Sequence, residues 1–256
     1  MKKNFNDLVE LSKHLRSPEG CPWDREQKLE TLRPYIIEEA YEVVQAIELK
    51  DKDEIIEELG DLFFQVIFAS QIASEDGEFD IEEVMDRLHN KLVRRHPHVF
   101  GDEKAKDAEE AIKTWHRQKL KEKSRKRRLL EIPRTMPSLL RAHRVGEKAS
   151  QVGFDWKSAQ EVLPKVKEEL NELEVEINNK NRNGIEKEFG DLVFSIVNLG
   201  RHLKLDSEST AHKAIDSFIN RFSKVEDKAQ EKGKELSGLT IEEMDELWEE
   251  VKSEGD

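Results

Sequence analysis

The sequence predicts an all-α protein built from two related domains, and three observations carry this prediction. Apolar residues recur at three- and four-residue spacing through much of the chain, which is the period of an amphipathic helix. Only 12 of the 256 residues are glycine and 7 are proline, which leaves few turn residues for a β-architecture. A short acidic motif, EExxE followed by ExxD, occurs once in each half of the chain with the same internal spacing.

The first half is expected to contain amphipathic helices separated by short polar or proline-containing segments. A turn at 20–24 follows the first helix, because Gly and Pro interrupt the helical pattern there. Asp80 is expected to open a later helix with a capping box. The expected helices occupy residues 4–15, a segment that begins near 31–34, a segment after the loop 50–53, a segment from Asp80 to the residue before Pro97, and the exposed stretch 103–128.

The second half repeats this order after the proline-containing segment 132–137. We therefore expect an N-terminal domain at 1–132, of which 103–132 includes a basic connector helix, and a C-terminal domain at 133–256. A repeat of about 130 residues indicates duplicated domains, because solenoid repeats are about 20–50 residues long. The expected helices here are one that begins near Leu139, two that carry the acidic motif, one at 207–222 and a last one opened by Thr240.

Composition and charge restrict the class of protein. The net charge of −13 argues against general nucleic-acid binding through the whole surface. A single cysteine, Cys21, excludes an intramolecular disulfide and fits a reducing cytoplasm. The first residues lack the apolar run of a signal peptide, and no stretch approaches the ~18–20 apolar residues of a membrane-spanning helix. We therefore expect a cytoplasmic protein that does not bind a membrane.

The repeated acidic motif is the strongest indication of a functional site. Residues three or four positions apart share a helix face, so each copy presents paired carboxylates from two successive helices. Such carboxylates repel one another and need a counter-ion, and oxygen ligands suit Mg²⁺, Mn²⁺ or Ca²⁺. A solvated helix face is the other interpretation, but the same spacing beside apolar positions in both halves favours a metal site. The carboxylates are Glu39, Glu42, Glu58 and Asp61, and Glu169, Glu172, Glu188 and Asp191.

The glycine inside each ExxD motif adds a second expectation. Gly60 and Gly190 lie within predicted helices, where glycine costs ~1 kcal/mol relative to alanine. We therefore expect another helix or a ligand to approach closely at these positions. A di-iron carboxylate site is disfavoured, because none of the 8 histidines has a glutamate three residues before it.

Cationic and aromatic residues favour phosphate as the partner of such a metal. Each half has a basic helix end and, further along, a tryptophan followed one helical turn later by a lysine. Carboxylates that hold Mg²⁺, with cations that bind phosphate oxygens, are the pairing that phosphoryl transfer requires. The tryptophan rings either stack on a base or belong to the core. The residues are Lys91, Arg95, Trp115 and Lys119, and Arg221, Trp248 and Lys252.

The sequence closely resembles the MazG family of nucleoside triphosphate pyrophosphohydrolases over nearly its whole length. Besides the two acidic motifs, the resemblance rests on four segments: CPWD at 21–24, RRHPHVF at 94–100, VGFDW at 152–156 and NLGRHL at 198–203. Each motif alone is modest in specificity, and together in this order they are strongly specific.

The resemblance implies two all-α domains, each with a four-helix core, usually assembled as a homodimer. It implies Mg²⁺-dependent hydrolysis of nucleoside triphosphates to the monophosphate and pyrophosphate, with Mn²⁺ as the alternative metal. By this resemblance the eight carboxylates above are metal ligands, and Glu38 or Glu168 positions or deprotonates the attacking water. The cations and tryptophans above are then the substrate-binding residues.

The second half departs from the family pattern in its cations. The pattern has a lysine four residues before the arginine of the basic helix, and Lys91 meets it, but Ser217 stands at this place before Arg221. A basic residue expected in the loop of the second acidic hairpin is also displaced, with only Lys180 and Arg182 nearby. The first domain therefore has the more complete set of cations, although two-domain members of the family are usually thought to work through the second.

The sequence is compatible with two other functions. A non-catalytic scaffold or sensor would bind metal and nucleotide without turnover and dock a partner through the basic segment 117–128. A specialised dUTP or phosphoribosyl-ATP pyrophosphatase shares the chemistry but fits the tandem motifs less well. An assay for pyrophosphate release separates the scaffold from the enzyme.

Overall fold

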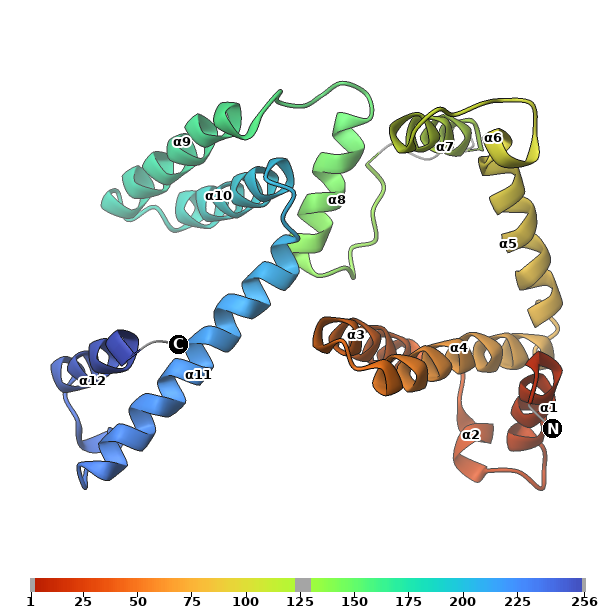
Figure 1. Ribbon diagram of the computed structural model, residues 1–256, viewed down its shortest axis with the longest axis horizontal. Helices are drawn as coiled ribbons and strands as arrows, with labels where there is room; N and C mark the ends of the chain where they lie inside the picture. Colours follow the sequence, from red (N-terminus) through yellow and green to blue (C-terminus); the bar gives the residue numbers. More distant parts are fainter. Residues whose placement is uncertain (1–2, 123–129, 255–256) are drawn as a thin grey trace. The chain divides into compact units, whose positions relative to one another are not determined.

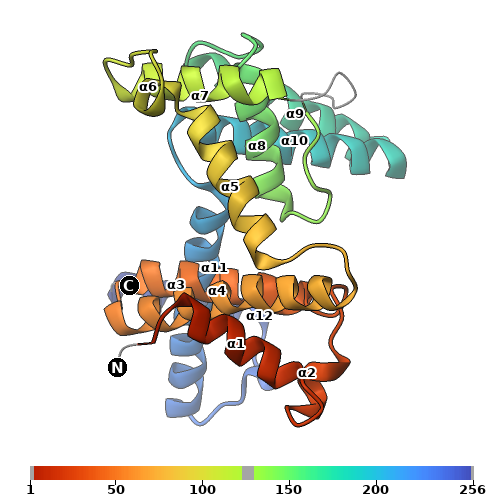
Figure 2. The same cartoon turned by 90° about the vertical axis from the view of Figure 1, so that its right-hand side faces the viewer.

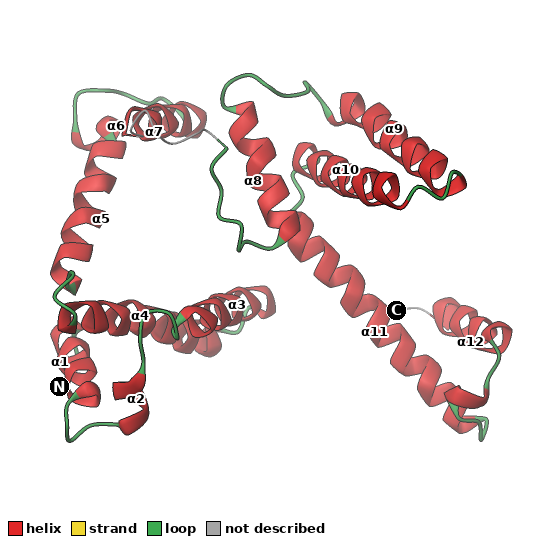
Figure 3. Ribbon diagram, turned by 180° about the vertical axis from the view of Figure 1, so that it is seen from behind, coloured by secondary structure: helices red, strands yellow, loops and turns green. Residues whose placement is uncertain are grey.

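The structure is a computed structural model that describes residues 3–122 and 130–254. All regular structure in these residues is helical, as Figure 3 shows, so the predicted all-α fold is confirmed. The chain divides into two compact units, residues 1–122 and 123–256. The domain boundary at 132/133 stays a prediction, and the basic run 125–128 lies outside the described residues.

The first unit is built around the helix pair α3–α4, which carries the first acidic motif. Figures 1 and 2 show these helices side by side, and α1 packs against α4. The helices of this unit are α1 (Phe5–Arg16), α2 (Pro22–Glu26), α3 (Arg33–Leu49), α4 (Lys52–Glu75), α5 (Ile81–Arg95), α6 (Pro97–Phe100) and α7 (Ala108–Glu122).

The second unit is built around the corresponding pair α9–α10. Helix α8 packs against α10, and α12 packs against the C-terminal part of the long helix α11 (Figure 1). The helices of this unit are α8 (Ser138–Ser150), α9 (Ala159–Asn178), α10 (Arg182–His202), α11 (Ser207–Glu231), the short 3₁₀ helix η1 (Leu236–Gly238) and α12 (Ile241–Glu254).

In both acidic hairpins the turn between the two helices has a lysine with a positive φ, followed by a residue that caps the second helix. Lys50 ends α3 with a φ of 58°, and the next residue, Asp51, caps α4 through its side chain. In the second unit Lys180 has a φ of 54°, and the next residue, Asn181, caps α10. A positive φ is uncommon for a residue other than glycine. Its recurrence at the same place in both hairpins supports the duplication predicted from the sequence.

Arg16 holds the segment between α1 and α3 against α4. Its guanidinium pairs with Glu75 at 2.7 Å and donates hydrogen bonds to the carbonyl oxygens of Asp24 and Gln27. The Arg16 side chain is only 8% exposed, so water competes little for these bonds. This arginine therefore fixes the path of the chain into the first acidic hairpin.

The buried apolar groups are small, and much apolar surface stays exposed. Large apolar side chains of α3, α4, α9 and α10 face solvent, including Ile37, Phe63, Leu170 and Phe189. Buried groups comprise Leu32, Phe68 and Ile72 in the first unit, and Val225, Ala229, Leu247 and Val251 in the second.

Some expected helices have different bounds in the structure. The predicted helix 103–128 begins only at Ala108, because the Asp107 side chain accepts a hydrogen bond from the backbone of Glu110 and caps the helix there. Helix α11 runs to Glu231, beyond the predicted end at 222, because Val225 and Ala229 continue its apolar face into the core. No helix among the described residues combines the length and apolar character that crossing a membrane requires.

Candidate active site

The acidic residues of the first unit gather between α3 and α4. Glu39 from α3 lies with Glu58 and Asp61 from α4, and one carboxylate oxygen of each falls within 4.8 Å of the others. We call these three residues the first acidic group. Desolvation, followed by repulsion between the carboxylates, raises the pKa of both Glu39 and Glu58. A hydrogen bond from Gln65 Nε2 to Glu39 Oε1, at 3.3 Å, only partly offsets this.

The second acidic group is more deeply buried. It consists of Glu169 and Glu172 from α9 and Glu188 from α10, with one oxygen of each again within 4.8 Å of the others. Glu169 and Glu188 are only 5% and 8% exposed. The Oε2 atoms of both are buried and have no hydrogen-bond partner among the described residues. A buried oxygen without a partner is costly, so the second acidic group fits a bound hard cation, for which oxygen is the preferred ligand.

Two lysines act as counter-ions of the second acidic group. Lys165 Nζ lies 2.7 Å from Glu169 Oε1. Lys187 Nζ lies 2.7 Å from Glu188 Oε1 and 3.3 Å from Asp191 Oδ2. The sequence interpretation missed both, although each lysine stands four residues before an acidic partner, a spacing that predicts an ion pair on a helix.

The sequence of the first unit has no lysines at the corresponding positions. Tyr35 and Glu57 stand at the corresponding positions, four residues before Glu39 and Asp61. In the second unit the hydrogen bonds to Glu188 and then Asp191 raise the pKa of Lys187 to about 12, and those to Glu169 and Glu168 raise the pKa of Lys165. The two groups therefore differ in burial and in the charge that surrounds them.

Four of the predicted acidic residues lie outside these two groups: Glu38, Glu42, Glu168 and Asp191. Glu42 is exposed, and its charge raises the pKa of Glu39 and Glu58. Glu168 is exposed and accepts a hydrogen bond from Lys165 at 3.0 Å, and Glu38 is exposed beside Glu39. Each unit thus gathers three carboxylates, with two further predicted acidic residues on the same hairpin.

The glycines of the ExxD motifs do not meet a neighbouring helix. A Cβ added at Gly60 or at Gly190 would find nothing within 4 Å. Of the two expected neighbours, a helix of the described chain is therefore excluded, and the approach of a ligand stays a prediction. Both positions lie on exposed faces of the acidic hairpins and are open to a ligand or to another molecule.

In each unit a cation lies over a tryptophan ring. The Cζ atom of Arg95 is 5.3 Å from the ring centroid of Trp115, and the Nζ atom of Lys119 is 4.6 Å from it. In the second unit the Cζ atom of Arg221 is 5.0 Å from the centroid of Trp248. The ring quadrupole attracts a cation at such distances, so each ring holds its arginine on the basic helix in place.

Trp248 also belongs partly to the core of the second unit. It packs against the buried α11–α12 group, and its ring centroid lies 5.1 Å from that of Phe218. Lys252 is exposed and pairs with Glu249 at 3.0 Å. In the first unit Lys91 is half-buried on α5.

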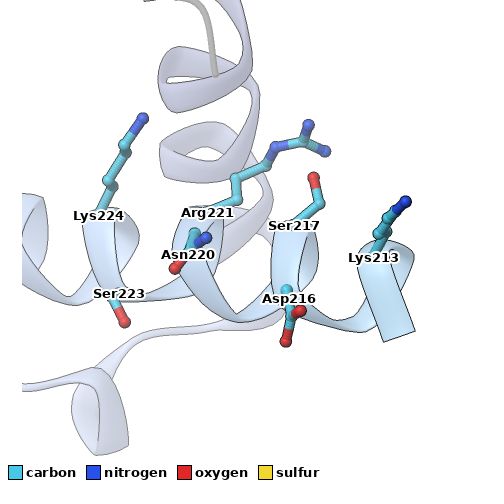
Figure 4. A pocket seen from close by; sticks show the side chains of 7 residues that line it. All are labelled: Lys213, Asp216, Ser217, Asn220, Arg221, Ser223 and Lys224. Atoms are coloured by element: carbon cyan, nitrogen blue, oxygen red, sulfur yellow. The ribbon is translucent and has the colours of Figure 1, made fainter. Parts of the chain in front are cut away.

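An open pocket of about 550 Å³ lies along α11 and is shown in Figure 4. Its lining includes the predicted Arg221 together with Lys213 and Lys224, which the sequence interpretation did not single out. Figure 4 shows the side chains of Lys213, Ser217, Arg221 and Lys224 on one side of the helix and that of Asp216 on the other. The four- and three-residue steps from Lys213 to Lys224 are the sequence signal of this basic face.

The chain matches a known family twice. The family is described as "MazG nucleotide pyrophosphohydrolase domain", and the matches cover residues 27–100 and 157–228. Each match contains one of the two acidic groups and one of the basic helix segments described above.

Known proteins are similar along nearly the whole chain. The "Nucleoside triphosphate pyrophosphohydrolase/pyrophosphatase MazG" of Thermotoga maritima is 48% identical over 250 residues, which are 97% of this chain and 95% of that protein. The "Nucleoside triphosphate pyrophosphohydrolase" of Escherichia coli is 41% identical over 251 residues, 96% of this chain and 95% of that protein. A solved "mazG-related protein from Thermotoga maritima" is 31% identical and covers 45% of this chain and 98% of its own, with a TM-score of 0.39. By its two family matches and its similarity to the T. maritima and E. coli pyrophosphohydrolases along nearly the whole chain, the chain belongs to the MazG nucleotide pyrophosphohydrolase family.

Proposed function

We propose that this chain is a nucleoside triphosphate pyrophosphohydrolase that converts a nucleoside triphosphate and water to the monophosphate and pyrophosphate. The observation that carries the proposal is the second acidic group, in which two buried carboxylates each have an oxygen without a partner. Family membership supports the same reaction, since the relatives in T. maritima and E. coli are named for it.

We propose Mg²⁺ as the metal, with Mn²⁺ as the alternative. All the atoms gathered in both acidic groups are carboxylate oxygens, which hard divalent cations prefer. The expected ligands are Glu39, Glu42, Glu58 and Asp61 in the first unit, and Glu169, Glu172, Glu188 and Asp191 in the second. The three gathered residues of each unit would hold the ion, and Glu42 and Asp191 lie on the same hairpins to complete the sets.

In the proposed reaction, different side chains bind the metal, accept the proton from water and bind the leaving group. When bound, Mg²⁺ would offset the charge on the triphosphate oxygens. Glu38 or Glu168 accepts a proton from water, whose oxygen bonds to the α-phosphorus. The bond from the α-phosphorus to the bridging oxygen breaks, and its electron pair leaves with pyrophosphate. Lys91 with Arg95 in one unit, and Arg221 in the other, bind the oxygens that gain negative charge.

We assign the remaining predicted substrate-binding residues to the nucleoside. A tryptophan ring offers a flat apolar surface for a base, and a cation beside it neutralises phosphate charge. These residues are Trp115 and Lys119 in the first unit, and Trp248 and Lys252 in the second. In the first unit the Nζ atom of Lys119 lies over the Trp115 ring, which supports this assignment.

The products formed in H₂¹⁸O test the reaction. Purified full-length protein is incubated with Mg²⁺ and each of several nucleoside triphosphates, and the products are separated and weighed by mass spectrometry. Attack at the α-phosphorus puts ¹⁸O in the monophosphate and none in pyrophosphate. Release of orthophosphate in place of pyrophosphate, or ¹⁸O in the pyrophosphate, would overturn the proposal.

We infer that a second copy of the chain covers the exposed faces of the acidic hairpins, so that the enzyme is a homodimer. Tyr41 is 48% exposed, Leu170 is 53% and Phe189 is 59%, although all three are large apolar or aromatic side chains of these hairpins. Soluble monomers rarely expose many such side chains together. Light scattering after size-exclusion chromatography is expected to give twice the mass of the chain. A monomer at micromolar concentration would contradict this.

We propose the cytoplasm as the compartment of this reaction. The sole cysteine, Cys21, is a free thiol, which a reducing compartment preserves. Fractionation of the native cells, with a marker enzyme for each compartment, checks this assignment.

A further inference from the structure

The two basic helices, α5 and α11, begin in the same way, which fixes how their residues correspond. The Asp80 side chain accepts a hydrogen bond from the backbone of Glu83 at 2.9 Å, and the Asp206 side chain accepts one from the backbone of Ser209 at 2.8 Å. Both aspartates are the residues that cap their helices. Glu83 and Ser209 are therefore equivalent positions in the first turn.

Four residues after this position each helix has a cation, but only one of the two cations is paired. In α5 the guanidinium of Arg87 forms an ion pair with the carboxylate of Glu83. In α11 the equivalent acid is replaced by Ser209, and Lys213 has no ion pair with any described residue. The charge of Lys213 is therefore available to a ligand, whereas Arg87 already has Glu83 as its partner.

One helical turn later, the helix with the unpaired lysine is α5 and not α11. Lys91 of α5 has no ion pair within the described chain, and Ser217 of α11 stands at its place. Both helices then have an arginine one turn further on, Arg95 or Arg221. Each basic helix therefore has one unpaired lysine on the same face as its arginine, and in α11 this lysine is Lys213, one turn earlier.

The pocket on α11 joins these positions. Lys213, Ser217 and Arg221 line it together, and Figure 4 shows all three side chains on one side of the helix. Lys213 and Arg221 are two turns apart, or about 12 Å along the axis, and Ser217 between them has a hydroxyl that can donate to an anion. The carboxylate of Asp216, which also lines the pocket, points to the other side.

We propose that Lys213 is a phosphate-binding residue of the second unit and takes the role that Lys91 has in the first. With Arg221 it would bind the phosphate oxygens of the triphosphate that leave as pyrophosphate, across the hydroxyl of Ser217. This role of Lys213 rests on the proposed function. Lys213 would supply the positive charge that is absent at position 217 of the second unit.

The test moves the charge along the helix in the full-length chain. Glu58→Gln is introduced first, to disable the first acidic group, so that turnover reports on the second unit. Lys213→Ala is expected to raise both the KM for the nucleoside triphosphate and the Kd for inorganic tripolyphosphate about tenfold, the loss of one charge-assisted contact. Adding Ser217→Lys to this variant restores the lysine at the position of Lys91. Both constants are expected to return to within about twofold of the parent.

Arg87→Ala is the control for the loss of one positive charge, because it removes the equivalent cation from the disabled first unit and leaves the second unit intact. It is expected to leave both constants unchanged. Lys213→Gln is the second variant if Lys213→Ala lowers the Tm, although an exposed lysine without an ion pair is expected to leave the Tm unchanged.

The outcomes separate this proposal from the proposed function. Pyrophosphate release by the parent, with unchanged KM and Kd in the Lys213 variants, overturns the role of Lys213 and leaves the reaction intact. If no protein releases pyrophosphate, the proposed function fails. The tripolyphosphate Kd then decides the role of Lys213 alone. A weaker Kd that Ser217→Lys does not restore would show that Lys213 acts through its own position and overturns the equivalence with Lys91.

Discussion

Lys187 is a cation that a metal entering the second acidic group must displace. Its Nζ lies 2.7 Å from Glu188 Oε1 and 3.3 Å from Asp191 Oδ2. We predict that Lys187→Gln lowers the Mg²⁺ dissociation constant of this group about two- to fivefold, the size of an exposed ion pair. Isothermal titration calorimetry at low ionic strength, in a chain that also has Glu58→Gln, measures this constant.

Lys167→Gln is the control for this prediction. It removes the same charge from the exposed side of α9, where Lys167 has no ion pair with a described residue. An equal gain in affinity from both variants would attribute the effect to net charge rather than to Lys187. Because the pKa of Lys187 is raised to about 12, this lysine stays charged, and the effect should be the same at pH 7 and pH 9.

The raised carboxyl pKa values of Glu39, Glu58 and Glu172 predict that metal affinity depends on pH. For each residue desolvation is the largest cause, and repulsion from neighbouring carboxylates adds to it. A raised pKa means that these groups begin to bind protons above the usual 4.5, and a metal must displace those protons. We therefore expect the Mg²⁺ dissociation constant to rise as the pH falls from 7 to 5. Calorimetry in two buffers of different ionisation enthalpy counts the protons released.

The same shifts set the sign of the stability change. A group whose pKa is raised in the folded state stabilises the metal-free protein below the unfolded value, and this contribution is lost as the pH rises through the folded value. Added Mg²⁺ should therefore raise the Tm at pH 7 and have little effect near pH 4.5. An increase in Tm that is equal at both pH values would contradict the assignment of these carboxylates.

At the scale of elements, Asp155 ties the segment before α9 to the end of α10. Its carboxylate accepts a hydrogen bond from Arg201 Nη1 at 2.9 Å and lies 3.0 Å from His202 Nε2. Arg201 in turn donates from Nε to Asn198 Oδ1 at 2.9 Å. We predict that Asp155→Asn lowers stability by about 1–2 kcal/mol and the Tm by about 3–6 °C. Circular dichroism during heating measures the loss.

The loss caused by Asp155→Asn should itself depend on pH. Burial raises the pKa of Asp155, but the hydrogen bonds from Arg201 and His202 outweigh it and lower the pKa below 3.8. A lowered pKa contributes stability above the unfolded value, and this contribution disappears as the pH falls through the folded value. The difference in stability between the two proteins should therefore shrink as the pH falls below 3.8. Glu186→Gln, which breaks the exposed pair with Arg182, is expected to leave the Tm unchanged.

Most long helices could be predicted because their signals are local. Asp80 and Thr240 cap helices as predicted, since a cap needs only the next few residues. The full capping box forms at Thr240, whereas at Asp80 the Glu83 side chain pairs with Arg87 instead. Asp107 has the same signal for α7, although the predicted helix begins earlier, at residue 103. The short helices α2 and α6 could not be predicted from periodicity, because helices of four or five residues are shorter than two turns. Each begins at a proline, which suits a first turn.

The acidic residues could be predicted as a set, but not their grouping. Spacing of three and four residues places the carboxylates on one helix face, and the duplication distinguishes them from ordinary surface acids. Which three come together depends on side-chain direction and burial, which the sequence does not specify. Glu42 stays outside the first acidic group, whereas its counterpart Glu172 lies within the second.

At the scale of the whole molecule, the two units are duplicated but differ in the chemistry of their acidic groups. This difference predicts which unit contributes more of the pyrophosphate release. The second unit has the more buried carboxylates, Glu169 and Glu188, whose unpartnered oxygens fit a metal. On its basic helix, serine stands at position 217, where the family pattern has a lysine. Lys213 lies one turn away on the same face. We therefore predict that Glu172→Gln lowers pyrophosphate release at least about tenfold, as the loss of a charge-stabilising group at an active centre does.

Glu42→Gln should lower pyrophosphate release less than twofold by the same reasoning, since Glu42 is exposed and outside the first acidic group. Initial rates of both variants and of the double variant, with saturating Mg²⁺, measure the share of each unit. Glu48→Gln and Glu174→Gln remove exposed carboxylates from the same two helices and serve as matched controls without an expected effect. Equal partial losses from Glu42→Gln and Glu172→Gln would show that both units turn over. A larger loss from Glu42→Gln would place the main site in the first unit, where Lys91 and Arg95 supply the cations. Burial of the carboxylates would then matter less for activity than a complete set of phosphate-binding residues.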